Sequence, residues 1–179
     1  ERGGVSKRIV NLASTIVGHI SGGLAAVSIV ACTFFAAISG STPATAAAVG
    51  GLTIPEMEKR GYDRSYASAV VAAASCLGVI IPPSITMVIF GIVANVSVGQ
   101  LLIGGIIPGL FLSFLLICVN LVRSRQLGYP TEERKTWKER WHTFSDAVWG
   151  LMMPIIILGG IMTGIFTPTE SAAIAVVYG

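Results

Sequence analysis

The chain has 179 residues, of which 53% are apolar and only 12% are charged, with a formal net charge of +3. This composition and a mean hydropathy of +0.78 indicate an integral membrane protein rather than a soluble domain. The basic residues flank apolar segments without interleaved aromatic residues, which argues against a nucleic-acid partner. The three cysteines lack metal-ligand spacing, so we expect neither a disulfide framework nor a zinc site. Because the chain opens without Met and ends inside an apolar run, we expect it to be part of a larger polypeptide.

Lysine and arginine gather around residues 2–8, 59–64 and 123–140. Short basic loops favour the cytoplasmic side of a membrane. Each uncharged tract between these clusters is therefore expected to cross the membrane an even number of times, or to enter and return. Residues 65–122 are long enough for two spans at roughly 20 residues each.

Residues 1–20 are predicted to form an interfacial arm helix, because polar residues such as Lys7 and Arg8 are mixed with apolar ones such as Ile9 and Leu12. That mixture is typical of an amphipathic helix lying at the membrane surface. Residues 21–97 contain both interrupted apolar segments, and the family resemblance described below implies that they form half of a transport domain.

Within that half, residues 22–57 are predicted to form a re-entrant helical hairpin. The apolar stretches 22–38 and 44–54 are each short for a full span, and the polar sequence Ser-Gly-Ser-Thr-Pro at 39–43 lies between them. A hairpin that enters from the cytoplasm and turns near the middle of the membrane suits these lengths better than two spans do.

The predicted tip of the hairpin brings two half-helix ends to one depth. Gly40 can end the first half-helix, and Thr42 can cap the second. Carbonyls at Ser39 and Gly40 favour a cation, whereas amides at the start of the second half-helix favour an anion. The residues expected near that anion are Ser41, Thr42 and Thr45.

A broken transmembrane helix is predicted over residues 66–94. Pro82 and Pro83 lack the amides that would bond the carbonyls of Gly78 and Val79, so those oxygens need a partner. Carbonyl and hydroxyl ligands without a carboxylate suit a hard monovalent cation such as sodium more than a transition metal.

Each proline break has an alternative explanation, because prolines in transmembrane helices also form plain kinks satisfied by neighbouring Ser or Thr. Two breaks on consecutive elements, both with small hydroxyl residues, favour a solute and ion site. A passive channel-like pore, which also uses exposed carbonyls, and a structural membrane subunit with kinked helices stay open as alternatives.

Residues 98–146 are predicted to form a scaffold span, over 98–122, followed by a cytoplasmic or interfacial arm over 131–144. Trp137 and Trp141 lie four residues apart, which places both indoles on one helix face, as interfacial anchors prefer. A solvated charged loop is the alternative for this arm.

Residues 147–179 are predicted to form a further scaffold span, over 147–166, and the start of another helix. Thr167 and Glu170 have the spacing of a capping box, with Pro168 at the first helical position. The chain holds no H-E-x-x-H or G-x-S-x-G motif and no paired intramembrane aspartates, so we do not expect an enzyme.

Several motifs, taken in order, resemble the large membrane (permease) subunit of tripartite ATP-independent periplasmic (TRAP) transporters. They are Gly-Gly-Val-Ser-Lys-Arg-Ile at 3–9, Ser-Gly-Ser-Thr-Pro-Ala-Thr-Ala-Ala-Ala-Val-Gly at 39–50, Gly-Tyr-Asp at 61–63, Gly-Val-Ile-Ile-Pro-Pro-Ser-Ile at 78–85 and Gly-Ile-Phe-Thr-Pro-Thr-Glu at 164–170. The resemblance implies an all-α integral membrane fold of the inverted-repeat elevator type, of which this chain is a part. It also implies a multi-pass protein of the bacterial inner membrane.

The same resemblance implies the chemistry and the partners. Na+ would be the coupling ion, and the cargo would be an organic anion such as a C4-dicarboxylate or sialic acid. A periplasmic substrate-binding protein would deliver the cargo, and a small membrane subunit would complete the assembly in the lipid bilayer. By resemblance, carbonyls of Gly78, Ile81 and Pro83 would bind sodium, and Ser41 and Ser84 would lie near the substrate. Many relatives carry an aspartate where this chain has Thr45.

Overall fold

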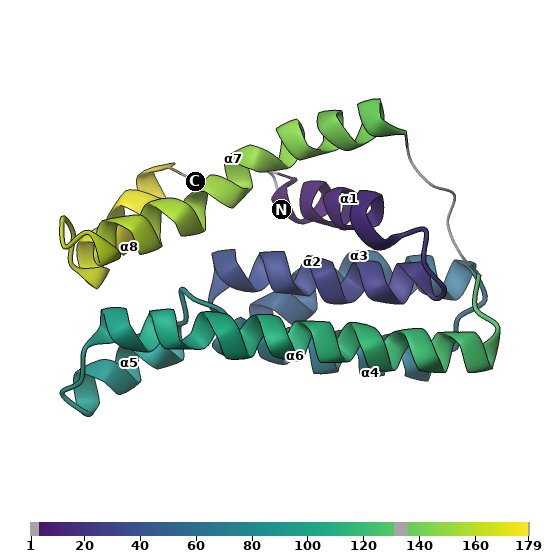
Figure 1. Ribbon diagram of the computed structural model, residues 1–179, viewed down its shortest axis with the longest axis horizontal. Helices are drawn as coiled ribbons and strands as arrows, with labels where there is room; N and C mark the ends of the chain where they lie inside the picture. Colours follow the sequence, from purple (N-terminus) through teal and green to yellow (C-terminus); the bar gives the residue numbers. More distant parts are fainter. Residues whose placement is uncertain (1–3, 131–135, 179) are drawn as a thin grey trace.

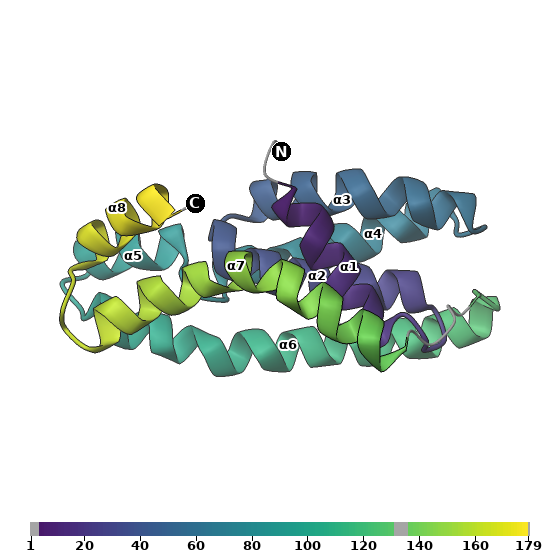
Figure 2. The same cartoon turned by 90° about the horizontal axis from the view of Figure 1, so that it is seen from above.

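The computed structural model describes residues 4–130 and 136–178, and all regular secondary structure in these residues is helical. The helices run in the order α1 (Val5–Val17), α2 (Gly23–Ser39), α3 (Thr42–Lys59), α4 (Arg64–Ser75), the 3₁₀ helix η1 (Cys76–Val79), α5 (Ile85–Val93), α6 (Val98–Leu127), α7 (Trp137–Met162) and α8 (Pro168–Tyr178). In Figure 1, α1 and the first half of α7 lie on one side of α2, and α6 lies on the other. Figure 2 shows α3 and α4 running side by side.

The predicted helical hairpin is present as α2 and α3, and its re-entry into the membrane stays a prediction. Gly40 ends α2 in the left-handed region, at φ 59°, and its amide donates to the carbonyl of Ala36 at 3.0 Å. Glycine adopts this conformation without the steric cost that a Cβ brings. The cap of α3 is Ser41 rather than Thr42. Ser41 has extended geometry and its carbonyl accepts the first intrahelical bond, from the amide of Thr45.

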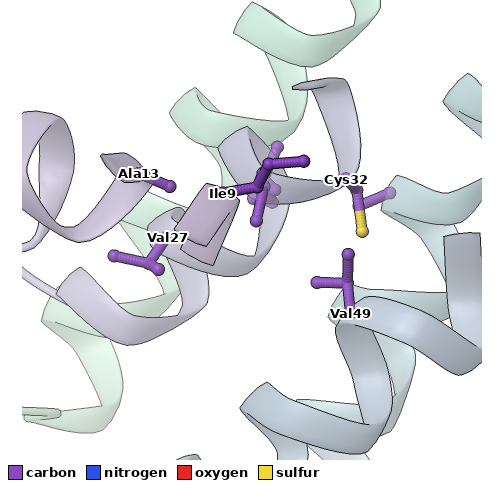
Figure 3. Packing of buried hydrophobic residues seen from close by; sticks show 8 residues of the cluster. Ile9, Ala13, Val27, Cys32 and Val49 are labelled. Atoms are coloured by element: carbon purple, nitrogen blue, oxygen red, sulfur yellow. The ribbon is translucent and has the colours of Figure 1, made fainter. Parts of the chain in front are cut away.

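The core is built around α2, whose small residues let neighbouring helices approach closely. Figure 3 shows Ile9 and Ala13 of α1 facing Val27 and Cys32 of α2, with Val49 of α3 on the far side. All of these side chains are buried. The hairpin therefore packs between α1 and α4.

The predicted broken helix is also present, as α4, η1 and α5. The helix tightens to 3₁₀ geometry from Cys76 and leaves helical geometry before the cis peptide bond between Pro82 and Pro83. It resumes at Ile85, capped by the hydroxyl of Ser84, which accepts the amide of Met87. Proline has no amide to donate, which explains why the helix cannot pass this segment.

Two helices, α6 and α7, are long and apolar enough to cross a membrane. The scaffold span predicted at residues 98–122 is part of α6, which packs against the hairpin and the broken helix through contacts with α2, α4, η1 and α5. Its role as scaffold stays a prediction. Its contacts with α7 are few.

The interfacial arm and the following span, predicted as separate elements that meet at residue 146, form one continuous helix, α7. Residues 131–135 of the predicted arm lie outside the described residues. The capping box before α8 is confirmed: the amide of Thr167 donates to Glu170 Oε2 at 2.8 Å, and the amide of Glu170 donates to Thr167 Oγ1 at 3.3 Å. These bonds satisfy amides that the start of a helix leaves free.

Candidate functional site

The tip of the hairpin and the break in the second helix lie against one another. The amide of Ile85 donates to the carbonyl of Gly40 at 3.3 Å, which joins the end of α2 to the start of α5. A Cβ added to Gly40 would collide with the carbonyl oxygen of Pro83. A Cβ added to Gly78 would lie 2.8 Å from the carbonyl carbon of Ser41. The structure thus brings both predicted breaks into direct backbone contact.

At the break, some backbone carbonyls accept hydrogen bonds and others have no donor. The amides of Ile80 and Ile81 both turn to the carbonyl of Leu77, at 3.0 and 2.8 Å. Within residues 4–130 and 136–178, no donor bonds the carbonyl oxygens of Gly78 or Ile81. That of Pro83 is equally without a donor there. These unpaired oxygens are the ligands that a cation can use.

The carbonyl oxygen of Val79, which was predicted to need a partner, has one within the break. The hydroxyl of Ser84 donates to it at 2.9 Å. Ser84 is buried, and its oxygen also lies 2.9 Å from Thr86 Oγ1. Ser84 thus reaches back across the break and caps α5, so its contact with a solute stays a prediction.

Hydroxyls within the hairpin hold the tip in shape. The hydroxyl of Thr45 donates to the carbonyl of Ser41 at 2.8 Å and lies 2.9 Å from Ser39 Oγ. Ser39 Oγ in turn accepts the amide of Ser41 at 3.3 Å. Thr45 is fully buried. The side chains of Thr45 and Ser39 are therefore engaged inside the hairpin, and direct contact of Thr45 with a solute stays a prediction.

Other donors at the tip are uncommitted. Among the residues that the structure describes, the side-chain hydroxyls of Ser41 and Thr42 make no hydrogen bond. Both residues are half-buried. The backbone amide of Thr42 is also without an acceptor in that part of the chain. An amide and hydroxyls at a helix start offer an anion the partial positive charge of the helix dipole.

The site carries no charge of its own. The structure brings together the residues predicted to bind the ion and the substrate, all buried or half-buried: Ser39, Gly40, Ser41, Thr42, Thr45, Gly78, Ile81, Pro83 and Ser84. No group of at least three His, Cys, Asp or Glu that could hold a metal occurs among the described residues. Carbonyls and hydroxyls alone suit a weakly held monovalent cation, by the ligand preferences of hard ions.

Close packing of α6 behind the break was not predicted from the sequence. A Cβ on Gly105 would collide with the carbonyl oxygen of Ile80, and one on Gly109 would lie 2.6 Å from Ile81 Cγ1. One turn further on, Ser113 Oγ lies 2.7 Å from Thr33 Oγ1 of α2. The signal was available, because glycines four residues apart are a known pattern for close helix contact.

The chain as a whole matches a known protein family. The family model described as "Tripartite ATP-independent periplasmic transporter, DctM component" matches residues 1–179. This chain belongs to that transporter family. The DctM component family is one of membrane permeases and not of enzymes, in keeping with the two long apolar helices.

Named relatives of this DctM family chain transport different solutes. The C4-dicarboxylate TRAP transporter large permease protein of Vibrio cholerae is 48% identical over 98% of this chain and 39% of the relative. The isethionate TRAP transporter permease protein of Oleidesulfovibrio alaskensis is 48% identical over 99% of this chain and 28% of the relative. The C4-dicarboxylate TRAP transporter large permease protein of Pseudomonas aeruginosa is 46% identical over 98% of this chain and 41% of the relative. The chain therefore spans well under half the length of these relatives.

Proposed function

We propose that this chain is part of the permease subunit of a sodium-coupled secondary transporter that imports an organic acid. The observation that supports it is the contact between the hairpin tip and the broken helix, where the Gly40 carbonyl accepts the Ile85 amide. Transporters place solute and ion sites at such interrupted helices near the middle of the membrane. The protein would be a multi-pass component of the bacterial inner membrane.

The proposed sodium ligands are carbonyl oxygens at the two breaks. Those of Gly78, Ile81 and Pro83, at the break, lack a donor in the described chain, and so does that of Ser39 at the end of α2. The carbonyl oxygen of Gly40 accepts the amide of Ile85 and would bind sodium through its second lone pair. An unpaired carbonyl away from water costs free energy comparable to a lost hydrogen bond, so a bound cation stabilises this arrangement. Ligands from both breaks would make ion binding sensitive to how the two are held together.

The proposed anion partners are the uncommitted donors at the start of α3. Ser41 and Thr42 offer hydroxyls, and Thr42 offers its amide. The carboxylate or sulfonate of an organic acid would accept from these groups, as anions do at helix starts. Thr45 and Ser84 would position them, through the bonds described above.

The proposed partners follow from the tripartite family. A periplasmic binding protein would deliver the acid, and a small membrane subunit would complete the assembly. We propose elevator-type alternating access, in which the hairpin and the broken helix move as one unit against the rest of the protein. The direct bond between Gly40 and Ile85 favours movement as one unit, because separating α2 from α5 would break it.

The experiment uses the full-length permease with its small subunit and binding protein in proteoliposomes. We expect uptake of a radiolabelled organic acid to require an inward sodium gradient and the binding protein. Potassium in place of sodium should abolish it. Undiminished uptake without sodium would contradict the coupling, and single-channel currents far above transporter rates would favour the pore.

One observation favours the structural alternative, in which the break is a kink. The bond from Ser84 to the Val79 carbonyl is the kind of internal repair that satisfies a proline kink. A purely structural break predicts that Ser39→Ala, Ser41→Ala and Gly78→Ala leave transport unchanged. Sodium dependence that survives all three substitutions would favour that alternative.

A further inference from the structure

A groove of about 330 Å³ lies between α1 and the first half of α7. Its lining residues are Leu12, Thr15, Ile16, Trp137, Arg140, Trp141 and Phe144. A second hollow, of about 680 Å³, shares Trp137 and Trp141 and adds Lys138, His142 and Ser145. Neither hollow belongs to the hairpin site, because α1 and the start of α7 contribute none of the residues assigned there.

The groove is lined mainly by apolar residues and holds one cation, Arg140, and the adjoining hollow adds Lys138. Trp137 and Trp141 are 77% and 68% exposed, although both are large aromatic residues. The described lining contains the cations Lys138 and Arg140 and no carboxylate. Exposed tryptophans beside basic residues are typical of the boundary between lipid tails and head groups.

The side chain of Arg140 has a hydrogen-bond donor that no described residue satisfies. Its Nε is buried and has no hydrogen-bond partner among the described residues. A guanidinium presents donors in a planar fork that matches a phosphate, and a buried donor without a partner costs free energy. Nearby carboxyl groups do not serve it: Asp146 pairs with His142 at 3.1 Å, and Glu139 Oε2 accepts the amide of Thr136.

Along α7, the residues change from charged to apolar close to the groove. Arg140 and Lys138 lie in the charged first part of α7, and the apolar part of the same helix follows Ala147. On α1, Arg8 donates to the carbonyl of Asp146 at 3.4 Å, which fixes the two helices against one another. A ligand in the groove would therefore sit at the end of a membrane span, where head groups lie.

We propose that the groove binds an anionic phospholipid. The phosphate would accept from the guanidinium of Arg140 and be attracted by the charge of Lys138 in the adjoining hollow, and an acyl chain would lie along Ile16, Trp141 and Phe144. The positive lining selects an anionic head group, and the aromatic wall selects a molecule with tails over a soluble phosphate. The inference requires only that the chain is a membrane protein, and it does not depend on sodium coupling.

The test measures lipid binding to the full-length permease with its small subunit by native mass spectrometry. Phosphatidylglycerol is the anionic probe and phosphatidylcholine the neutral one. We expect phosphatidylglycerol to bind more tightly, and Arg140→Gln and Lys138→Gln each to weaken it about fivefold, as one lost charge near a phosphate predicts. Arg140→Lys should keep most of the affinity. The matched control is Arg125→Gln, an exposed basic residue near the end of α6, which should leave affinity unchanged.

Several results would overturn the proposal. Equal affinity of wild type and Arg140→Gln for phosphatidylglycerol would do so, provided that the variant elutes as an intact assembly. If that variant fails to assemble, Lys138→Gln decides, because the side chain of Lys138 is exposed. Displacement of the lipid by soluble glycerol phosphate would assign a phosphate site without tails. Loss of the small subunit from Arg140→Gln with lipid affinity intact would assign the groove to that subunit.

Discussion

The carbonyl of Gly40 and the amide of Ile85 are joined by a hydrogen bond of 3.3 Å, and this bond connects two helix ends of opposite polarity. The end of α2 carries partial negative charge and the start of α5 carries partial positive charge. Their contact is stabilising by itself and leaves the neighbouring carbonyls to other partners. Changes at this junction are therefore the sharpest way to separate a binding site from a kink.

Gly78→Ala should abolish most transport. Its Cβ would lie 2.8 Å from Ser41 backbone atoms and 2.9 Å from the amide nitrogen of Thr42, so the tip must move away from the break. Overpacking of this kind costs about 1–3 kcal/mol, and we expect uptake in proteoliposomes to fall by about tenfold or more. The matched control is Gly51→Ala in α3, where a Cβ meets nothing within 4 Å. Equal uptake by the two variants would show that the junction is not needed for transport.

Ser41→Ala and Thr45→Val should have different effects. The Ser41 hydroxyl makes no hydrogen bond in the described chain, so its loss should not lower the melting temperature. It should raise the KM for the organic acid by about fivefold, which corresponds to the loss of one hydrogen bond to the solute. The Thr45 hydroxyl is bonded inside the hairpin, so Thr45→Val should lower stability by about 1–3 kcal/mol. Uptake kinetics and thermal unfolding of the same preparations check both. A Thr45→Val protein as stable as wild type, with a raised KM, would instead place Thr45 at the solute.

Gly109→Ala should loosen α6 from the break. The added Cβ would lie 2.6 Å from Ile81 Cγ1, and the expected loss of stability is about 1–3 kcal/mol. Gly104→Ala, on the same helix but with nothing within 4 Å of its Cβ, should leave the melting temperature unchanged. If both variants have the melting temperature of the wild type, the close packing of α6 against the break does not contribute to stability.

The start of α8 should weaken in acid. Hydrogen bonds from the backbone amide and then the hydroxyl of Thr167 hold the pKa of Glu170 below its ordinary value. A carboxyl whose pKa is lowered by folding contributes stability above its ordinary pKa, and that stability is lost as pH falls through the lowered value. Hydrogen exchange of α8 should therefore speed up, relative to the intrinsic rate, only at acidic pH. In Glu170→Gln the protection should not depend on pH, and a titration identical to wild type would contradict the assignment.

Local chemistry explains what the sequence predicted well. Gly40, the proline pair and the Thr167 capping box act on their own neighbours in the chain, so the hairpin, the break and the start of α8 could be placed in advance. The cap of α3 was misplaced by one residue, because Ser41 and Thr42 are both good caps and only geometry separates them.

What escaped prediction depends on contacts between distant segments. The bond from Ser84 back to Val79 and the approach of Gly109 to Ile81 require the folded arrangement. The continuity of α7 escaped for a different reason. The boundary at residue 146 was placed where the residues change from charged to apolar. Such a change marks a different environment and not a break in the helix, and α7 continues across it.

The nine clustered residues of the tip and the break include no ionisable side chain. None of them can gain or lose a proton near neutral pH. None of these nine side chains can therefore carry a proton. A response of uptake to acidity would have to arise at other residues of the assembly or in the cargo itself.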